Sequence, residues 1–555
     1  MRIVVVGGVA GGMSCAARAR RLAEDAEIIV LERGELVSFA NCGLPYHVSD
    51  EIRDRAALLL QTPKSLRAAL NLDVRTRHEA TAIDRGAKTV TIRSAAGETT
   101  LGYDALVLAP GARAIRPPLP GLDLPIVHPL RTVPDADRIR AMVADGARRA
   151  VVLGAGFIGL EAAEALRARG LDVTIVELAA HVLPPLDEEL ASLVDAELAA
   201  HGVHRRIGIA ASAVEQSPGP EHAVDVVLSD GSRLPADLVV LSVGVRPDTS
   251  LAKDAGLDLG PTGAIRVDGS FRTSDPRIWA VGDAIEVTHA ITGAIGPIPL
   301  AGPANRQGRM AAESILGRAV TPAPVLGTAV VRVFGLTAAI TGAGQSALDA
   351  AGIEHFTVHL HPGHHAEYFP GAEQIHLTAS FSPDGRLLGA QGVGKAGVDK
   401  RIDVFATALR AGMTADDLAE LELAYAPPFG SAKDPINMTG FIAQNVLAGT
   451  LELWYPSELE DAMNDALILD VRSRGEFVRG HLKGALNIPH TELRGRIQEV
   501  GAAADGRPVR VHCESGFRSY LAHRVLSQAG FDSANLSGGI MTLLAARPEL
   551  ELVTG

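Results

Sequence analysis

Cysteine is scarce: three residues in a chain of 555 are too few for a disulfide framework. We therefore expect a reducing compartment, where a lone exposed cysteine is more often catalytic than structural. No uninterrupted apolar run of about eighteen residues occurs, which argues against a membrane span. The N-terminus enters an apolar stretch at once, without the charged start and cleavage site of a secretory signal. Together these absences predict a cytoplasmic protein.

Positive charge is also in short supply, with 52 Lys and Arg against 65 Asp and Glu. The formal net charge is −13 and no basic run occurs, so nucleic acid and anionic membranes are poor partner candidates. Aromatic residues make up only 4%, whereas glycine is abundant at 58 residues, which is typical of α/β folds with many tight turns. The apolar content of 47% excludes a disordered chain, and the length predicts several domains.

A strand–glycine turn–helix–strand pattern occurs twice, about 145 residues apart. The first copy consists of Arg2–Val6, Gly7–Gly12, Ser14–Ala23 and Ile28–Leu31. The second consists of Ala150–Leu153, Gly154–Gly159, Leu160–Arg169 and Val173–Val176. Each copy ends at an acidic residue, Glu32 or Glu177. The repeat predicts two dinucleotide sites in doubly wound α/β domains.

The second copy carries the complete spacing G-x-G-x-x-G at Gly154, Gly156 and Gly159. The first glycine makes the turn, the second lets the backbone approach a pyrophosphate, and the third lets the helix pack closely on the sheet. Glu177 is placed to accept hydrogen bonds from a ribose diol, and its charge would repel a 2′-phosphate. This favours NADH over NADPH, against the alternative of a glycine turn with no ligand.

The first copy is less regular, because Val9 replaces the middle glycine between Gly7 and Gly12. Two further features support a dinucleotide site in this copy: Glu32 at the ribose position and a later Ala-Val-Gly-Asp that ends at Asp283. A strand-end aspartate can accept a hydrogen bond from a flavin ribityl hydroxyl, although it can also simply cap a turn. FAD at the first site and NAD(H) at the second is the consistent interpretation, since hydride transfer needs both rings to meet.

Cys42 stands about ten residues beyond Glu32, in the stretch SFANCGLPY. A helix N-terminus there would steady a thiolate able to enter thiol–disulfide exchange. No C-x-x-C or C-x4-C partner accompanies it, so the second sulfur must come from a substrate or an oxidised form of the cysteine. A buried structural cysteine is the alternative, and that is our interpretation of Cys15.

A further cysteine, Cys513, follows an apolar strand (Val509–His512) and precedes a helix. The six residues from Cys513 to Arg518 can form a loop whose N–H groups point inward. Such a nest, near an arginine, lowers the pKa of a thiol and stabilises an anionic persulfide. The alternatives are a cysteine in an ordinary capped turn, or a phosphatase, whose loop has one residue more.

Several long stretches resemble the single-cysteine pyridine nucleotide–disulfide oxidoreductases, and most closely CoA-disulfide reductases. They are VVGGVAGG, SFANCGLPY, GAGFIGLEAA, AVGDA, PLAGPANRQGR, VGKAGVDKRIDV and YAPPFGSAKDPIN. The stretch HCESGFRS, with Asp470–Arg472, Gly480–His481 and Asn487–Pro489, resembles a rhodanese domain. The whole chain therefore resembles the CoA-disulfide reductase–rhodanese fusions, which act as persulfide and polysulfide reductases.

The resemblance implies roles for particular residues. The catalytic set would be Cys42, Cys513, Tyr368, Tyr425 and Arg518, with both tyrosines reaching the site from a dimer partner. The CoA path would be Arg18, Arg21, Ser38, Asn41 and, from the partner, Lys433. The FAD site would be Gly7, Val9, Ala10, Gly11, Gly12, Glu32, Arg33, Asn41, Cys42, Ala80, Asp283, Ala301, Tyr425 and Phe429. The NAD site would be Gly154, Gly156, Phe157, Ile158, Gly159, Glu177 and Gly244.

The expected architecture is two doubly wound dinucleotide-binding domains, a mixed α/β dimerisation domain and a small rhodanese-like α/β domain. The FAD-binding domain would span 1–115 and 246–325, and the NAD(H)-binding domain 116–245. The dimerisation domain would span 326–450 and the rhodanese domain 455–555. The resemblance implies a homodimer with FAD, NADH (or NADPH) and CoA as substrate or bound ligand, and we expect no metal. Our hypothesis for the reaction has two parts. NADH reduces FAD, and the reduced flavin regenerates the Cys42 thiolate. This thiolate attacks a persulfide such as CoA persulfide, while Cys513 supplies sulfane sulfur.

Three alternatives remain: a plain CoA-disulfide reductase, an NADH oxidase, or a rhodanese unit that only docks a sulfur-donor protein. Related oxidases and peroxidases carry a histidine where this chain has Ala10, and without that proton donor oxygen chemistry is disfavoured. Two positions depart from some CoA-disulfide reductases, Leu70 where a lysine occurs and Asn305 where a histidine occurs. The histidines of His355–His365 lack a ligand spacing, so we expect a solvated strand edge there rather than a metal site.

Overall fold

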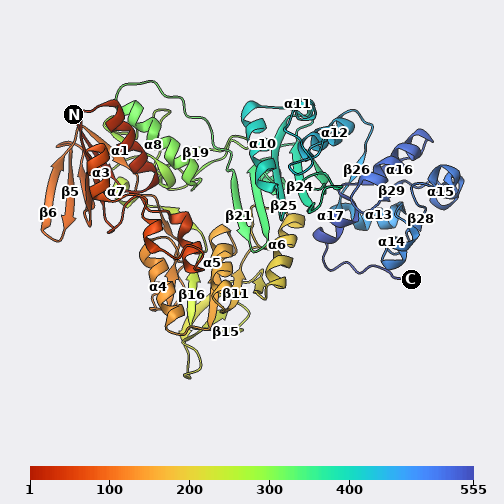
Figure 1. Cartoon of the computed structure of the whole chain (residues 1–555), viewed down its shortest axis with the longest axis horizontal. Helices are drawn as coiled ribbons and strands as arrows, with labels where there is room; N and C mark the ends of the chain where they lie inside the picture. Colours follow the sequence, from red (N-terminus) through yellow and green to blue (C-terminus); the bar gives the residue numbers. More distant parts are fainter. The chain divides into compact units, whose positions relative to one another are not determined.

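The structure, a computed structural model, describes residues 1–555. The chain forms two compact units (Figure 1). The first contains Met1–Ala180 and Gly202–Gly327, and the second contains His181–His201 and Thr328–Gly555. The segment His181–His201 thus belongs with the second unit, although it lies inside the range expected for the NAD(H)-binding domain. The domain boundaries proposed from the sequence stay predictions.

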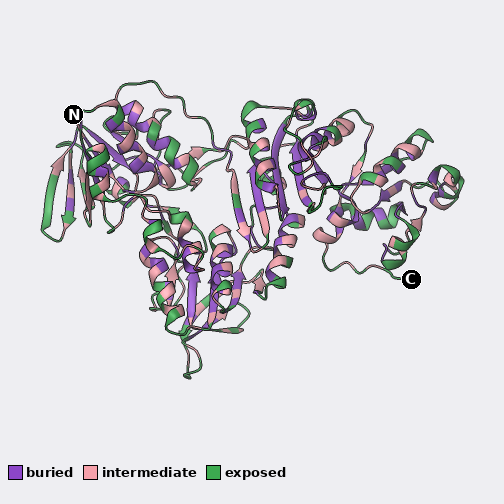
Figure 2. Cartoon of the chain, viewed as in Figure 1, coloured by how far each residue is buried: buried purple, intermediate pink, exposed green.

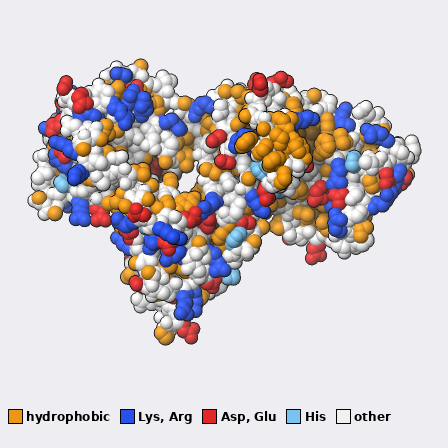
Figure 3. Space-filling model, viewed as in Figure 1, with side chains coloured by type: hydrophobic (Ala, Val, Ile, Leu, Met, Phe, Trp, Pro, Cys, Tyr) orange, Lys and Arg blue, Asp and Glu red, His pale blue; other side chains and the backbone are white.

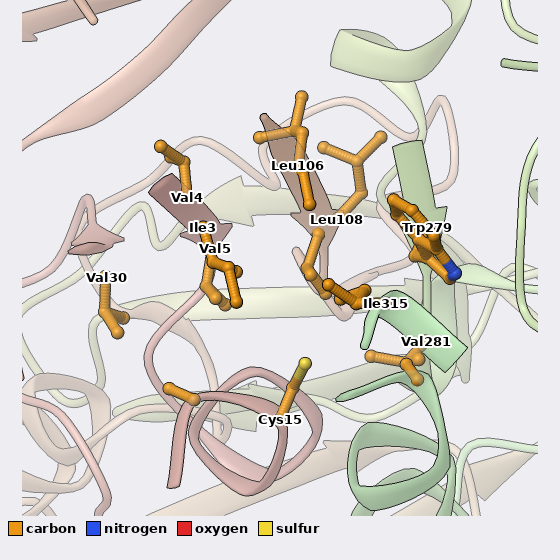
Figure 4. Packing of buried hydrophobic residues seen from close by; sticks show 14 of the residues in the cluster. Ile3, Val4, Val5, Cys15, Val30, Leu106, Leu108, Trp279, Val281 and Ile315 are labelled. Atoms are coloured by element: carbon orange, nitrogen blue, oxygen red, sulfur yellow. The ribbon is translucent and has the colours of Figure 1, made fainter. Parts of the chain in front are cut away.

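The first dinucleotide-binding sheet is parallel, in the order β18-β7-β1-β2-β3. Its strands are β18 (Ile278–Ala280), β7 (Ala105–Leu108), β1 (Arg2–Val6), β2 (Glu27–Glu32) and β3 (Asp73–Thr76). Helices α1 (Ala10–Leu22) and α8 (Ala301–Ile315) pack against each other beside it. Ile3, Val4 and Val5 are fully buried, as expected for a strand covered on both faces (Figure 4). Cys15 packs into this core, which confirms its structural interpretation.

The second parallel sheet repeats this arrangement in the order β12-β11-β10-β16-β9. Its strands are β12 (His204–Ile207), β11 (Asp172–Glu177), β10 (Arg149–Leu153), β16 (Leu238–Leu241) and β9 (Val127–Pro129). Helix α5 (Phe157–Ala168) joins β10 to β11. Two three-stranded antiparallel sheets also belong to the unit: β4 (Glu79–Asp84), β5 (Thr89–Ser94) and β6 (Gly97–Gly102), and β13 (Ala211–Gln216), β14 (Val224–Leu228) and β15 (Arg233–Ala236). Two-stranded antiparallel sheets are formed by β8 (Ala112–Ala114) with β17 (Val245–Pro247), and by β19 (Val287–Thr288) with β20 (Ile295–Gly296).

Both turn helices begin earlier than the sequence predicts. Helix α1 begins at Ala10 instead of Ser14, and α5 at Phe157 instead of Leu160. The reason is that the last glycine of each turn lies within the first helical turn. A Cβ at Gly12 would lie 1.9 Å from the Gly7 oxygen, and one at Gly159 would lie 2.0 Å from the Gly154 oxygen. Glycine there lets the helix start against its own strand.

The second unit contains an antiparallel sheet in the order β21-β22-β25-β24-β23. The strands are β21 (Ala329–Val333), β22 (Leu336–Gly342), β25 (Leu387–Gly394), β24 (Ile375–Phe381) and β23 (Phe356–Leu360). Helices α6 (Glu188–Ala200) and α10 (Val398–Ala411) pack on it, and α11 (Ala415–Glu420) packs on α12 (Pro435–Leu447). Its central strands are among the most buried of the unit (Figure 2).

The C-terminal sheet of the second unit is parallel, in the order β26-β30-β29-β27-β28. Its strands are β26 (Leu453–Trp454), β30 (Ser533–Leu536), β29 (Val509–His512), β27 (Leu467–Asp470) and β28 (Leu486–Asn487). The helices are α13 (Leu459–Asp465), α14 (Arg474–Arg479), α15 (Ile497–Ala504), α16 (Phe517–Gln528) and α17 (Gly539–Ala546). These sheets confirm the predicted fold class. None of the helices has the length and apolarity that crossing a bilayer requires.

Candidate active sites

The first glycine turn and Glu32 form a cradle of backbone donors around a carboxylate. The Glu32 carboxylate accepts hydrogen bonds from the Gly8 N–H at 2.9 Å and the Gly34 N–H at 2.7 Å. A Cβ at Gly7 would lie 2.1 Å from the Ala109 oxygen, so no other residue fits this turn, whose φ is +108°. Gly11 adjoins Val281 across the turn that contains Asp283. The fold thus brings together three of the sequence segments expected to hold FAD.

The second turn has the same construction. The Glu177 carboxylate accepts from the Ala155 N–H at 2.6 Å and the Ala179 N–H at 2.8 Å. A Cβ at Gly154 would lie 2.5 Å from the Ser242 oxygen, whereas one at Gly156 would meet nothing within 4 Å. Open space beside the Gly156 backbone is what a close approach by a pyrophosphate requires. The residues present therefore fit a dinucleotide at each turn.

The other residues predicted for the two dinucleotide sites lie in ion pairs or at the ends of helices and strands. Arg33 pairs with Asp248 at 2.9 Å, and Asp283 pairs with Arg131 at 3.4 Å. Ala301 begins α8 and Ala80 lies in β4. Val9 and Ala10 lie at the start of α1, Phe157 and Ile158 at the start of α5, and Gly244 follows β16 with a φ of +103°.

Cys42 lies in a three-residue 3-10 helix, Asn41–Gly43, directly before α2 (Leu44–Val48). It is an exposed free cysteine, and Asn41 beside it is also exposed. Partial burial by surrounding atoms, together with the Glu161 and Asp283 carboxylates, raises the pKa of the Cys42 thiol. The protein alone therefore disfavours the thiolate, which differs from the stabilisation that the sequence predicts.

Ser38 connects the Cys42 segment to the first glycine turn. Its N–H donates to the Gly8 oxygen at 2.9 Å, and its oxygen accepts from the Leu60 N–H at 3.1 Å. Its φ of +46° is uncommon for a residue other than glycine, and such strained backbone concentrates at functional sites. This contact fixes the start of the loop that carries Cys42.

The arginines predicted along the CoA path lie on α1, one turn apart. Arg18 donates two hydrogen bonds to Glu313 of α8, at 2.6 and 3.0 Å, whereas Arg21 is exposed. Asn305, on the same face of α8, accepts from the Ser14 hydroxyl at 2.6 Å. An anion at Arg18 would compete with Glu313.

Tyr368 and Tyr425 meet in the second unit, with their hydroxyls 2.9 Å apart. Both are exposed, and the hydrogen bond to Tyr425 raises the pKa of Tyr368. Hydrophobic side chains gather on the surface around α12 and β24 (Figure 3). In the loops that precede β24 and α12, and in α12 itself, the exposed large apolar side chains are Tyr368, Phe369, Tyr425, Phe429, Phe441 and Leu447.

A buried ion pair holds the end of the loop that carries Tyr425, Phe429 and Lys433. Arg401 donates to Asp434 at 2.8 Å and to the His364 oxygen at 2.9 Å, and both charged side chains are almost fully buried. Asp434 also caps α12 through the Ile436 N–H. Lys433, one residue earlier, is exposed.

Cys513 directly follows β29 and begins the predicted loop. Its sulfur accepts hydrogen bonds from the Gly516 N–H at 3.3 Å and the Ser519 hydroxyl at 3.2 Å. Gly516 has a φ of +96° and forms the N-cap of α16, so the loop turns sharply into that helix. The cysteine is almost fully buried, with donors directed at its sulfur. This arrangement can stabilise an anionic sulfur.

Arg518, in the first turn of α16, makes a bidentate pair with Glu476, at 2.6 and 2.8 Å. The Arg518 guanidinium holds the pKa of Glu476 well below its usual range. No role is predicted from the sequence for Glu476 or Ser519. Glu476 stands three residues after Ser473, a capping-box spacing that is visible in the sequence and that the structure confirms.

The other rhodanese-like residues form the framework below the loop. Arg472 makes a bidentate pair with Asp470 and donates to the Gly480 oxygen at 2.7 Å. Asn487 donates to the Asp470 and Arg472 oxygens, each at 3.0 Å. Asp470 and Arg472 are buried and Asn487 is half-buried. Arg472 also reaches the loop directly, through an ion pair with Glu514 at 3.6 Å.

The histidines of His355–His365 do not form the solvated edge that the sequence predicts. Strand β23 is indeed at the edge of its sheet, but His359 and His365 are buried. The rhodanese-like domain covers this edge through Ser537 and Thr542. No three His, Cys, Asp or Glu side chains gather in a way that could hold a metal ion.

Comparison with known proteins accounts for all three parts of the chain. The family profile described as "Pyridine nucleotide-disulphide oxidoreductase" matches residues 1–308. The profile of that family's dimerisation domain matches residues 328–434, and the profile of the rhodanese-like domain matches residues 455–546.

Among curated relatives, the coenzyme A disulfide reductase of Staphylococcus haemolyticus is 35% identical over 453 residues, covering 80% of this chain and all of the relative. An NADH oxidase of Methanocaldococcus jannaschii is 34% identical over 446 residues, 79% of this chain and 97% of that protein.

Two solved structures cover nearly the whole chain. Reduced CoADR-RHD of Bacillus anthracis has a TM-score of 0.96 and 43% identity, over 100% of this chain and 99% of that one. The NAD-dependent persulfide reductase of A. fulgidus has a TM-score of 0.91 and 40% identity, over 98% and 100%. The chain belongs to the pyridine nucleotide-disulphide oxidoreductase family and carries a C-terminal rhodanese-like domain.

Proposed function

We propose that the protein reduces CoA persulfide, or a related polysulfide, with NAD(P)H at Cys42, and that Cys513 carries sulfane sulfur for this reaction. One observation supports the proposal most directly: besides the buried Cys15, the chain has two cysteines in different surroundings, neither of them in a disulfide. Cys42 is exposed beside the FAD-type cradle, and Cys513 is buried under donors directed at its sulfur. The names of the similar CoA disulfide reductase and persulfide reductase support it.

The two glycine cradles are the proposed binding sites of the cofactors. FAD would be held by the Gly7–Gly12 turn, Glu32 and Asp283, and NADH by the Gly154–Gly159 turn and Glu177. Bound FAD supplies the electron relay between a nicotinamide and a cysteine sulfur. The family membership supports both cofactors, and the negative charge of Glu177 supports NADH over NADPH.

The sulfur chemistry needs one nucleophile and two electrons. The Cys42 thiolate attacks the CoA-bound sulfur of the persulfide, the S–S bond breaks, and hydrosulfide leaves with the electron pair. Cys42 is left in a mixed disulfide with CoA. Two electrons from NADH then cleave this disulfide, which restores the Cys42 thiolate and releases CoA thiolate. With protons taken from solvent, CoA persulfide, NADH and one proton yield CoA, hydrogen sulfide and NAD⁺.

The Tyr368–Tyr425 pair is proposed to move protons near the leaving sulfur. Paired hydroxyls in which either oxygen can donate suit that role. Both tyrosines lie on the exposed apolar surface around α12, and the match to the family's dimerisation domain supports a homodimer. A reducing, cytoplasmic location is part of the proposal, since a free Cys42 thiol is needed for each turnover.

The test is steady-state NADH oxidation by the FAD-loaded protein with CoA persulfide as substrate. Cys42→Ser is expected to lose at least a thousandfold in rate, and full activity in this variant would refute the proposal. Cys513→Ser is the matched control, because it leaves reduction of ready-made CoA persulfide intact and lowers only sulfide release that starts from thiosulfate.

A plain CoA-disulfide reductase is the second candidate, favoured by the coenzyme A disulfide reductase relative. The two functions differ in kcat/KM for CoA disulfide against CoA persulfide. An NADH oxidase is the third, favoured by the similar archaeal oxidase. Ala10 opposes it, because the turn offers no imidazole near the flavin position. Oxygen consumption without added thiol separates it from the other two.

A further inference from the structure

Two histidines of the dimerisation sheet contact the rhodanese-like domain directly. His359, in β23, has its Nε2 2.8 Å from the Glu189 carboxylate and its Nδ1 2.8 Å from the Ser537 hydroxyl. Its backbone N–H also donates to the Ser537 hydroxyl oxygen, at 3.2 Å. His361, just beyond the strand, has its Nε2 2.8 Å from the Thr542 hydroxyl. Ser537 precedes α17 and Thr542 lies within it. The two histidines therefore contact the chain on both sides of the turn at which this helix begins.

The turn itself, Gly538–Gly539, is packed between these histidines and the loop of Cys513. A Cβ at Gly538 would lie 2.8 Å from the His359 Cβ and 3.0 Å from the His361 Nε2. A Cβ at Gly539 would lie 2.7 Å from the Cys513 oxygen and 2.6 Å from the Glu514 oxygen. Both glycines have positive φ, +69° and +67°. Backbone atoms alone therefore separate the dimerisation sheet from the loop.

The first turn of α17 then fixes the peptide groups of the loop. The Ile540 N–H donates to the Cys513 oxygen at 2.9 Å, and the Met541 N–H donates to the Glu514 oxygen at 3.1 Å. In a trans peptide the N–H points opposite to the C=O. With both carbonyls held toward α17, the N–H groups of Glu514 and Ser515 point away from that helix. An anion nest requires N–H groups with such a fixed direction.

We propose that His359 and His361 are positioning residues for the Cys513 loop. Through Ser537, Thr542 and the Gly538–Gly539 turn, the dimerisation sheet sets the direction of the loop's peptide N–H groups. The readiness of Cys513 to act as a nucleophile thus depends on a sheet outside its own domain. The value of this arrangement for sulfur transfer rests on the proposed function, whereas the positioning itself does not.

The test uses the FAD-loaded full chain and measures alkylation of Cys513 by iodoacetamide across pH, with peptide mass spectrometry to separate Cys513 from Cys15 and Cys42. Thr542→Val keeps the shape of the side chain and removes the hydroxyl that contacts the His361 Nε2, whereas Thr542→Ser keeps that hydroxyl. The contact of the His361 Nδ1 with the His376 Nδ1, at 2.9 Å, stays in both variants. We expect Thr542→Val and His361→Ala to slow alkylation at pH 7 by about threefold or more. This is the change in rate that corresponds to the net free energy of one hydrogen bond. The pH of half-maximal rate is expected to move upward.

Thr542→Ser is expected to react at the unaltered rate, as is His355→Gln. His355 directly precedes β23, and its ring contacts the Ile353 oxygen at 2.9 Å and lies 4.0 Å from the Asp349 carboxylate. Thermal unfolding of each variant, followed by circular dichroism, reports that it is folded. Unchanged Cys513 alkylation in both Thr542→Val and His361→Ala would overturn the proposal, and so would equal slowing in Thr542→Ser and His355→Gln. Alkylation needs no sulfur transfer, so failure of the proposed function would leave this result unaffected.

Discussion

The carboxylate of Glu476 holds both terminal nitrogens of Arg518, the arginine that closes the loop of Cys513. Both side chains are less than one-third exposed. The Arg518 guanidinium holds the pKa of Glu476 below its ordinary value of 4.5. A carboxylate whose pKa is lowered by folding stabilises the folded state fully above its unfolded pKa, and this stabilisation is lost as pH falls through the folded pKa.

Glu476→Gln is therefore expected to destabilise the rhodanese-like domain at pH 7 by about 1–2 kcal/mol, because a bidentate charged pair is lost. The difference from the unaltered protein should shrink as pH falls below about 4.5. Thermal unfolding at several pH values measures it. The control is Glu499→Gln, which breaks the fully exposed pair with Arg496 and should have a small effect. A destabilisation that did not depend on pH would contradict the assignment.

Glu177 provides a second prediction, on nucleotide choice. Its carboxylate is held by two backbone N–H groups at the end of β11, where a ribose 2′-phosphate would meet a like charge. Glu177→Ala combined with Leu178→Arg is expected to raise kcat/KM for NADPH by about tenfold or more, because repulsion is removed and a phosphate partner is added. Leu178 is 70% exposed, so an arginine there reaches solvent without disturbing the core.

The measurement is kcat/KM for both nucleotides with CoA disulfide as the common acceptor. The single variant Glu177→Ala removes the repulsion of the 2′-phosphate without adding the attraction of an arginine, so it separates the two effects. It should also weaken NADH binding, because the contact with the ribose is lost. If the double variant kept the original preference for NADH, Glu177 would not be the residue that selects the nucleotide.

The two dinucleotide turns were predictable because their chemistry depends on local sequence. Gly12 and Gly159 are needed where a helix starts against its strand, and that spacing is visible without a structure. The loop of Cys513 was predictable for the same reason. The role of His359 was not, because a buried polar partner 178 residues away, Ser537, leaves no local pattern. The raised pKa of Cys42 likewise arises from burial and, next, from the negative charge of Glu161, a residue of α5 that lies far from Cys42 in the sequence.

Glu161 provides a third prediction, on the reactivity of Cys42. After desolvation, its negative charge is the largest influence that raises the pKa of Cys42. Glu161→Gln is expected to shift the pH profile of Cys42 alkylation to lower pH, so that the rate at pH 7 rises about two- to fivefold. Peptide-resolved alkylation of the FAD-loaded protein measures it. Glu188→Gln, on α6 of the other unit, is the control and should leave the Cys42 profile in place.

The buried pair of Arg401 and Asp434 leads to the last prediction. Asp434→Asn would leave the Arg401 charge buried with a neutral partner, which typically costs about 3–5 kcal/mol of folding stability when a buried pair is broken. Because Asp434 adjoins Lys433 and ends the loop that carries Tyr425, we also expect turnover with CoA disulfide to fall while NADH binding persists. Glu373→Gln, which breaks the largely exposed pair with Lys395, is the matched control. Chemical unfolding and steady-state kinetics measure both effects, and a stable variant with normal turnover would show that the pair does not hold this loop in place.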